Sequence, residues 1–242
     1  MTAETGARLL DVRRLGRSRY DDAYALQKEL VDARAGGKVG DVLILTEHDP
    51  VVTVGRGTPP AATAGVDLPV VEVERGGEAT YHGPGQLVAY PILLLPEGRR
   101  DLHRYLRDLE DVVIGVLSEF ELEGVRKDGF TGVWLGDRKI CSVGVAVRRW
   151  VTWHGFALNL TTDLDAFRSF EPCGLRPDVM TRLADHAELP PTNILAEVLV
   201  VKHVCRVFEL ELPPPAPLAS PPEGEGGCGQ SGFPDLPLLP GH

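Results

Sequence analysis

Several features that mark other protein classes are missing from this 242-residue chain. Its four cysteines form no Cys-x-x-Cys pair, so we do not expect a structural zinc site. No apolar run approaches the eighteen residues of a membrane-spanning helix. The first residues lack the apolar stretch of a secretory signal, so the default expectation is a cytoplasmic protein with reduced thiols.

Positive charge is also scarce. Lys and Arg number 25 against 35 Asp and Glu, which gives a formal net charge of −10. Nucleic-acid binding depends on clustered Lys and Arg, so we expect no nucleic acid among the partners. A hydrophobic fraction of 43% is enough to form a buried core.

Two kinds of apolar pattern alternate along the chain. Helical spacing predicts helices over residues 20–35, 101–120 and 193–208. Short apolar runs predict strands over 41–45, 51–54, 68–73, 87–95, 131–135, 139–147 and 153–160, with a loop at 47–50. The sequence therefore predicts one body, residues 1–212, of intermixed helices and strands. Nine Pro and six Gly in residues 213–242 predict a disordered tail.

The segment 75–91 is the most informative one. It reads RGGEATYHGPGQLVAYP and has four glycines within its first eleven residues. Ordering glycine is costly, so such density makes sense where the backbone approaches a ligand closely, with Arg75 and His82 as polar groups beside it. A plain glycine-rich turn is the alternative. The segment lacks the phosphate-binding pattern GxxxxGK[ST] and the setting of a dinucleotide-binding GxGxxG.

Two further residues could carry chemistry. Lys139 begins an apolar strand; if partly buried it could stabilise a thiolate or act as a base, although a solvated hairpin lysine is the simpler interpretation. Cys173 lies between Pro and Gly in a loop that would expose its sulfur, and a nearby cation would favour the nucleophilic thiolate. An incidental cysteine is the alternative. Cys141 and Cys205 lie in apolar patterns that predict core positions, and Cys228 lies in the tail.

Four blocks in order carry a resemblance to a known family. They read RGGEATYHGPGQLVAYPI, RKICSVGVAV, WHGFALNL and EPCGL. Together they resemble the octanoyl-[acyl-carrier-protein]:protein N-octanoyltransferases, also called the lipoyl(octanoyl) transferase or lipoate-protein ligase B family, from about Tyr20 to Phe208. The resemblance implies a single α/β domain with a mixed sheet flanked by helices, as in biotin and lipoate protein ligases.

The resemblance also implies roles for individual residues. Cys173 matches the nucleophile that carries the acyl thioester, and Lys139 matches the partner that lowers its pKa. The implied substrate-binding residues are Arg75, Gly76, Gly77, Glu78, Ala79, Thr80, Tyr81 and His82, then Ser142, Val143 and Gly144, then Gly155, Phe156 and Ala157. Asp49 departs from the family, which often has Pro there.

The implied reaction transfers an octanoyl group from octanoyl-acyl carrier protein to a lysine amine. The acceptors would be lipoyl domains of 2-oxoacid dehydrogenase complexes and the glycine cleavage H protein, without a metal, nucleotide or other cofactor. Three alternatives stay open at this point. They are an ATP-dependent lipoate ligase, a non-catalytic lipoyl-domain binding protein on the same fold, and a cysteine hydrolase with His82 or His154 as its base.

Overall fold

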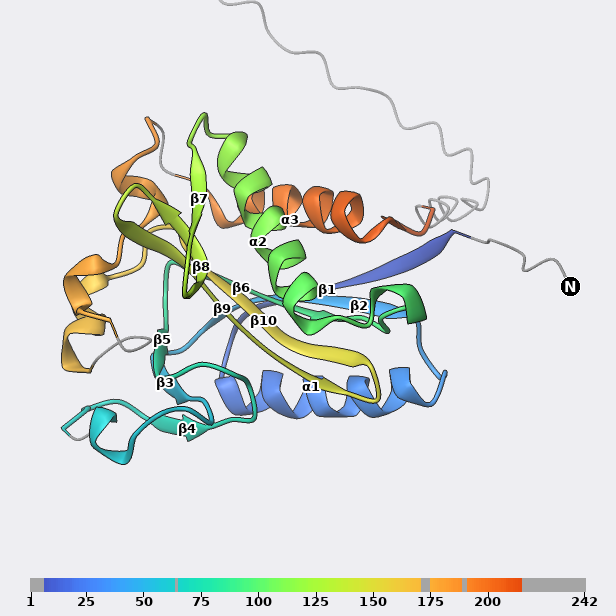
Figure 1. Cartoon of the computed structure of the whole chain (residues 1–242), viewed down its shortest axis with the longest axis horizontal. Helices are drawn as coiled ribbons and strands as arrows, with labels where there is room; N and C mark the ends of the chain where they lie inside the picture. The colour runs from blue at the N-terminus through green and yellow to red at the C-terminus, as the bar shows by residue number, and fades with distance from the viewer. Residues whose placement is uncertain (1–6, 64, 171–174, 189–190, 215–242) are drawn as a thin grey trace, which may run out of the picture.

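A mixed eight-stranded sheet runs through the part of the chain that the computed structural model describes, residues 7–63, 65–170, 175–188 and 191–214 (Figure 1). Its strand order is β11-β1-β2-β6-β10-β9-β8-β7. The strands are β1 (Arg8–Ser18), β2 (Asp41–His48), β6 (Gln86–Ile92), β7 (Gly124–Lys127), β8 (Phe130–Leu135), β9 (Arg138–Arg148), β10 (Val151–Asn159) and β11 (Leu210–Glu211). β1 pairs in parallel with β2 and β11, and the other neighbouring pairs are antiparallel.

Helices cover both faces of this sheet. They are α1 (Tyr20–Ala35), α2 (Leu102–Ser118) and α3 (Asn193–Phe208), with α1 below the sheet and α2 and α3 above it in Figure 1. Successive strand side chains point to opposite faces, so Leu43 and Leu45 join the core under α2 and α3, whereas Val42 and Ile44 join the core against α1. The predicted α/β domain with a mixed sheet flanked by helices is confirmed. In the described ranges no helix has both the length and the apolar character to cross a membrane.

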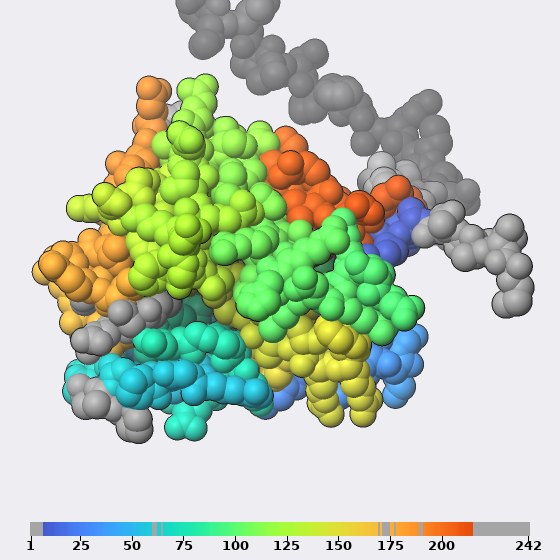
Figure 2. Space-filling model, in the orientation of Figure 1, coloured from blue at the N-terminus to red at the C-terminus, as the bar shows by residue number. Residues whose placement is uncertain are grey.

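A second, three-stranded sheet stands beside the main one. It contains β3 (Val51–Val54), β4 (Val70–Glu72) and β5 (Thr80–His82) in the order β4-β3-β5. Figure 2 shows this region in cyan along the lower part of the visible face, beside the end of the β9–β10 hairpin in yellow. Short 3-10 helices lie at Pro60–Thr63, Glu97–Arg99, Leu164–Ser169, Pro177–Val179 and Leu183–Asp185.

The predicted helices are confirmed, and α1 and α3 have the predicted bounds. The helix predicted over 101–120 corresponds to α2, which begins one residue later, after its N-cap Asp101, and ends at Ser118. One carboxylate oxygen of Asp101 accepts the backbone N–H groups of His103 and Arg104 at 2.9 and 3.1 Å. This satisfies two of the donors that a helix N-terminus leaves without a partner in the helix.

The strand predictions need several corrections. The predicted loop 47–50 is wrong at its start, because Glu47 and His48 continue β2 and pair with Arg17 and Ser18 of β1. β5 lies inside the glycine-rich segment, and β1, β7 and β11 were not predicted. Residues 215–242 lie outside the described residues, so the disordered tail stays a prediction.

A buried carboxylate, Asp41, ties three segments together at one end of the sheet. One of its oxygens accepts from Arg34 Nε of α1 at 2.8 Å and from the backbone N–H of Leu94 at 2.9 Å. The other accepts from Arg8 of β1. Asp41 is 3% exposed, so removing the carboxylate would leave two guanidinium groups and a backbone amide without their acceptor in or near the interior.

We therefore expect Asp41→Ala to lower the free energy of unfolding by about 3 kcal/mol or more. Asp49→Ala is the matched control, because Asp49 pairs with Arg17 at 2.8 Å on the surface and an exposed pair contributes about 1 kcal/mol or less. Urea titration of both variants measures the two values. Equal losses would show that Asp41 has no special part in joining these segments.

Candidate functional site

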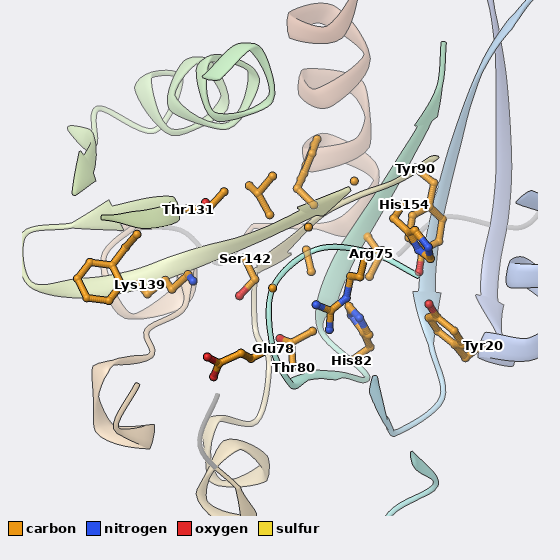
Figure 3. A pocket seen from close by; sticks show the side chains of 18 of the residues that line it. Tyr20, Arg75, Glu78, Thr80, His82, Tyr90, Thr131, Lys139, Ser142 and His154 are labelled. Atoms are coloured by element: carbon orange, nitrogen blue, oxygen red, sulfur yellow. The ribbon is translucent and has the colours of Figure 1, made fainter. Parts of the chain in front are cut away.

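A cavity of about 180 Å³ lies between the glycine-rich segment and strands β9 and β10 (Figure 3). A single water needs roughly 10–15 Å³ of such space, so the cavity suits a small ligand. Apolar walls come from Val88, Val143, Phe156 and Ala157. Figure 3 shows Lys139 towards one end of the cavity and Tyr20, Tyr90 and His154 towards the other, with Ser142 and Arg75 between them.

The structure brings most of the residues named from the sequence to this cavity. Those that line it are Arg75, Gly77, Glu78, Thr80, His82, Lys139, Ser142, Val143, Gly144, Gly155, Phe156 and Ala157. Three others do not. The backbone N–H of Gly76 donates to Val145 O at 3.0 Å. Ala79 and Tyr81 are buried in a separate cluster, where Tyr81 packs against Phe167 at 5.4 Å between ring centroids.

Two glycines paired on neighbouring strands line the cavity at a point where the structure has no space for a side chain. Gly144 of β9 and Gly155 of β10 are paired across the ladder. A Cβ atom on Gly144 would lie 2.9 Å from Arg75 Cδ, and one on Gly155 would lie 2.2 Å from Ala89 O. Both contacts are too short, so any side chain here would displace the guanidinium arm or push β6 and β10 apart.

A chain of buried hydrogen bonds fixes the polar side of the site. Arg75 donates to the hydroxyl and carbonyl oxygens of Thr53, both at 2.9 Å. The hydroxyl of Thr53 is 3.3 Å from His82 Nε2, and His82 Nδ1 is 2.8 Å from Gln86 Oε1. Gln86 Nε2 donates to Asn159 Oδ1 at 2.9 Å. Since Gln86 Oε1 can only accept, His82 carries its proton on Nδ1 and Nε2 accepts from Thr53.

Three histidines around the cavity are held neutral. Burial is the main cause in each case, and it lowers the pKa of His48 to about 4, that of His154 to about 3 and that of His82 well below its usual value. The Arg75 guanidinium acts in the same direction on His82 and His154. His48 Nε2 is 2.7 Å from the hydroxyl of Tyr90, which donates to it.

His154 combines two unusual features. Its backbone has a φ of +54°, a left-handed conformation that non-glycine residues seldom adopt. Its ring stacks on Trp153 at 4.4 Å between centroids, and within the described residues its buried Nε2 has no hydrogen-bond partner. Strain and unpaired polar atoms of this kind are concentrated at functional sites.

Lys139 is the buried cation of the site. The residue is 2% exposed and its Nζ lies 5.8 Å from the centre of the Trp134 ring. Among the described residues, Lys127 and Lys202 form ion pairs with carboxylates, whereas Lys139 forms none. A buried charge is costly without a partner, so an anion bound at this end of the cavity would stabilise the ammonium. The solvated-lysine alternative is wrong.

Sequence reasoning missed several residues that line the cavity. They are Tyr20, Val88, Tyr90, Gly129, Phe130 and Thr131, and His154 had been named only as a distant candidate base. Tyr20 and Tyr90 resemble ordinary core aromatics in the sequence. In the structure the Tyr20 ring stacks on His82 at 5.9 Å between centroids, and the Tyr90 hydroxyl lies 2.7 Å from His48 Nε2.

The proposed nucleophile, Cys173, lies outside the described residues, and so does Cys228. Of the described segments that flank Cys173, the one that follows it reaches Lys139. Phe170 is buried in the cluster with Ala79 and Tyr81. Met180 forms a bridge with Lys139, and the backbone N–H of Thr181 donates to Lys139 O at 2.9 Å. Cys141 is fully buried in the core as predicted, and Cys205 is half-buried against it.

Over the described residues, no three His, Cys, Asp or Glu side chains converge as ligands for a metal ion. The chemistry that the described groups offer is a buried ammonium, a set of neutral imidazoles and glycine backbone beside an apolar chamber. Backbone N–H groups near such a chamber can stabilise a developing oxyanion, and a buried ammonium can stabilise a nearby anion.

Comparison with known proteins identifies the class. The model of the lipoyl protein ligase A/B catalytic domain matches residues 19–203. The chain belongs to this family. Its curated relatives include an octanoyltransferase of Rubrobacter xylanophilus, 45% identical over 211 residues that cover 82% of this chain and 95% of the relative. Another, from Geobacter metallireducens, is 47% identical over 173 residues, 72% of this chain and 81% of the relative. The resemblance found in the sequence is confirmed, and the enzyme class is acyltransferase.

Solved structures agree on the fold. A lipoate-protein ligase A bound with ATP has a TM-score of 0.64 at 14% identity, covering 86% of this chain and 88% of that one. The biotin protein ligase of Aquifex aeolicus in complex with biotin and ATP has a TM-score of 0.50 at 13% identity, covering 84% and 71%. At these identities the likeness shows the fold alone.

The neutral histidines predict how stability depends on pH. Below about pH 6.5 the unfolded chain binds protons on His48, His82 and His154 that the folded chain does not yet bind. The free energy of unfolding should therefore fall with pH, from about 6.5 towards 4, by about 1.4 kcal/mol per pH unit for each histidine. Urea unfolding at pH 7, 6 and 5 measures the slope. Asn tolerates the left-handed backbone, so His154→Asn should fold and should reduce the slope by the contribution of one histidine. A free energy of unfolding that does not change with pH would contradict the burial argument.

Proposed function

We propose that this octanoyltransferase works through an acyl thioester on Cys173. Lys139 stabilises the Cys173 thiolate and transfers protons during the reaction. The observation that carries the proposal is the Lys139 ammonium, buried at one end of the cavity without a carboxylate partner among the described residues. A thiolate is the anion that such a cation would favour. The Pro-Cys-Gly sequence at 172–174 supplies a candidate thiol, and the chain that follows it returns to Lys139 at Met180.

The proposed first step moves the acyl group onto the enzyme. The Cys173 thiolate attacks the thioester carbonyl of octanoyl-acyl carrier protein, a carbon–sulfur bond forms to Cys173, and the bond to the carrier sulfur breaks. Lys139 gives its proton to the departing carrier thiolate and becomes a neutral amine. One thioester replaces another, so the step has little thermodynamic cost.

The proposed second step forms the product. The lysine amine of a lipoyl domain attacks the Cys173 thioester, an amide bond forms, and the Cys173 thiolate leaves. The attacking nitrogen must lose a proton, and the neutral amine of Lys139 takes it as a general base. Lys139 then carries the positive charge again, and the thiolate regains its partner.

The described cavity suits the acyl chain of this reaction. Val88, Val143, Phe156 and Ala157 offer an apolar lining, while the paired glycines of β9 and β10 leave room beside it. Of the residues assigned to substrate binding by resemblance, Gly76, Ala79 and Tyr81 do not line this cavity, so we propose no direct contact between them and the acyl chain.

The proposed partners follow from the same reaction. The donor is octanoyl-acyl carrier protein, and the acceptors are lipoyl domains of 2-oxoacid dehydrogenase complexes and the glycine cleavage H protein, in the cytoplasm. An ATP-dependent ligase is the rival on this fold. The curated relatives at 45–47% identity are octanoyltransferases, whereas the ATP-bound ligase shares 14% identity; this favours transfer over adenylation.

The thioester is tested by mass. Incubation with octanoyl-acyl carrier protein alone should add one octanoyl group that hydroxylamine removes. Cys173→Ala should abolish the adduct and turnover, while Cys141→Ala, a change inside the core, should keep at least part of both. Peptide mapping of the acyl group to Cys141 would overturn the assignment.

A separate change tests the partner of the thiol. Lys139→Met keeps much of the apolar stem and removes the charge. We expect the pKa of Cys173 to rise by about one unit or more, because the thiolate loses its cation, and acyl transfer to slow strongly. The pH dependence of Cys173 alkylation by iodoacetamide measures the first effect. An unchanged profile would remove Lys139 from this role.

A further inference from the structure

Lys139 faces the cavity because β9 contains a bulge next to it. On β9 and its partner β8, Val133 pairs with Cys141 but Trp134 pairs with Lys139, so Ile140 is an extra residue. In a regular strand Lys139 and Cys141 would share a face. Here Ile140 and Cys141 both pack into the core under α2 and α3, and Lys139 lines the cavity. Bulges re-aim side chains in this way next to active sites.

A glycine opposite the bulge makes room for the lysine. Gly132 of β8 has a φ of +131°, which L side chains rarely adopt. A Cβ atom there would lie 2.7 Å from Lys139 Cε, 3.4 Å from its Nζ and 2.5 Å from Cys141 O. Any side chain at 132 would therefore displace both the end of the lysine and the backbone of the bulge.

A buried carboxylate holds that glycine in place. The backbone N–H of Gly132 donates to Glu110 Oε1 of α2 at 2.9 Å. Glu110 is fully buried, and its other oxygen accepts from Arg107 at 2.7 Å and from Arg126 of β7 at 2.8 Å. The strand conformation beside Lys139 is thus tied to α2 and β7 through one charged group.

We propose that Gly132 and Glu110 are positioning residues for the reaction, because together with the Ile140 bulge they turn the Lys139 ammonium into the cavity. The inference rests on the proposed function only for its effect on rate. The placement of Lys139 is a property of the fold, and it can be measured without donor or acceptor.

Gly132→Ala is the direct test, with Gly136→Ala as its matched control. Gly136 lies in the same hairpin with a φ of +54°, but a Cβ atom there meets nothing within 4 Å. The first readout is acetylation of the Lys139 amine by acetic anhydride, followed by peptide mass spectrometry. In Gly132→Ala the Lys139 side chain is displaced towards solvent, so its amine should be acetylated about tenfold faster, a factor that corresponds to roughly one pKa unit. In Gly136→Ala the rate should equal that of the wild type.

The second readout is a double-mutant cycle on acyl transfer to Cys173. Gly132→Ala alone should slow transfer by about tenfold or more. Added to Lys139→Met, it should cost less than about threefold, since two changes that act through one group are not additive. Additive losses, or unchanged labelling of Lys139, would overturn the proposal.

Glu110→Gln gives a second route if Gly132→Ala fails to fold. Gln keeps an acceptor for the Gly132 amide but loses the charge that binds the two arginines, so Lys139 labelling should rise by about two- to fivefold, less than in Gly132→Ala. Labelling at the wild-type rate in this variant would also overturn the proposal. Absence of an acyl adduct in the wild-type enzyme would instead count against the thioester mechanism, because the labelling results do not depend on it.

Discussion

One buried side-chain amide, that of Gln86, joins the parts of the molecule that build the cavity. It accepts from His82 of the small sheet and donates to Asn159 of the main sheet and to the carbonyl of Tyr81. Asn159 in turn donates to Thr181 O at 2.9 Å, and the amide of Thr181 binds Lys139 O. The imidazole of His82 and the backbone of Lys139 are therefore connected by one continuous network. Such networks are rigid only while every member is satisfied.

The regular elements could be predicted where their apolar pattern is strong. α2 has the strongest helical periodicity, with one face buried from Tyr105 to Leu117, and β9 and β10 are long strands with many apolar residues joined by a short turn. β1 could not be predicted in the same way, because its sequence, RLLDVRRLGRS, places charges on a half-exposed strand. The predicted loop 47–50 includes His48, yet this residue is fully buried in β2, where it forms a hydrogen bond with Tyr90.

The site could be predicted only as far as local patterns reach. Glycine density marked the segment around Arg75, since close backbone approach leaves that signature in the sequence. The direction in which Lys139 points could not be read, because strand periodicity places it on the same face as Cys141 and a bulge at Ile140 reverses that. Tyr20 and Tyr90 meet His82 and His48 only through the tertiary fold, so no spacing in the chain connects them.

The two edges of the main sheet limit how this protein can associate with other chains. At one side β11 covers only Arg8 and Leu9, so the rest of β1 forms the edge, which carries several arginines and is irregular between Arg14 and Gly16. At the other side β7 is irregular near Val125 and carries Arg126 and Lys127. Short, charged or irregular edge strands oppose the addition of a further strand from another polypeptide. An acceptor domain, itself presenting a folded surface, would then be held by contacts between side chains around the cavity. Recognition of this kind would leave the backbone ladder of both partners intact.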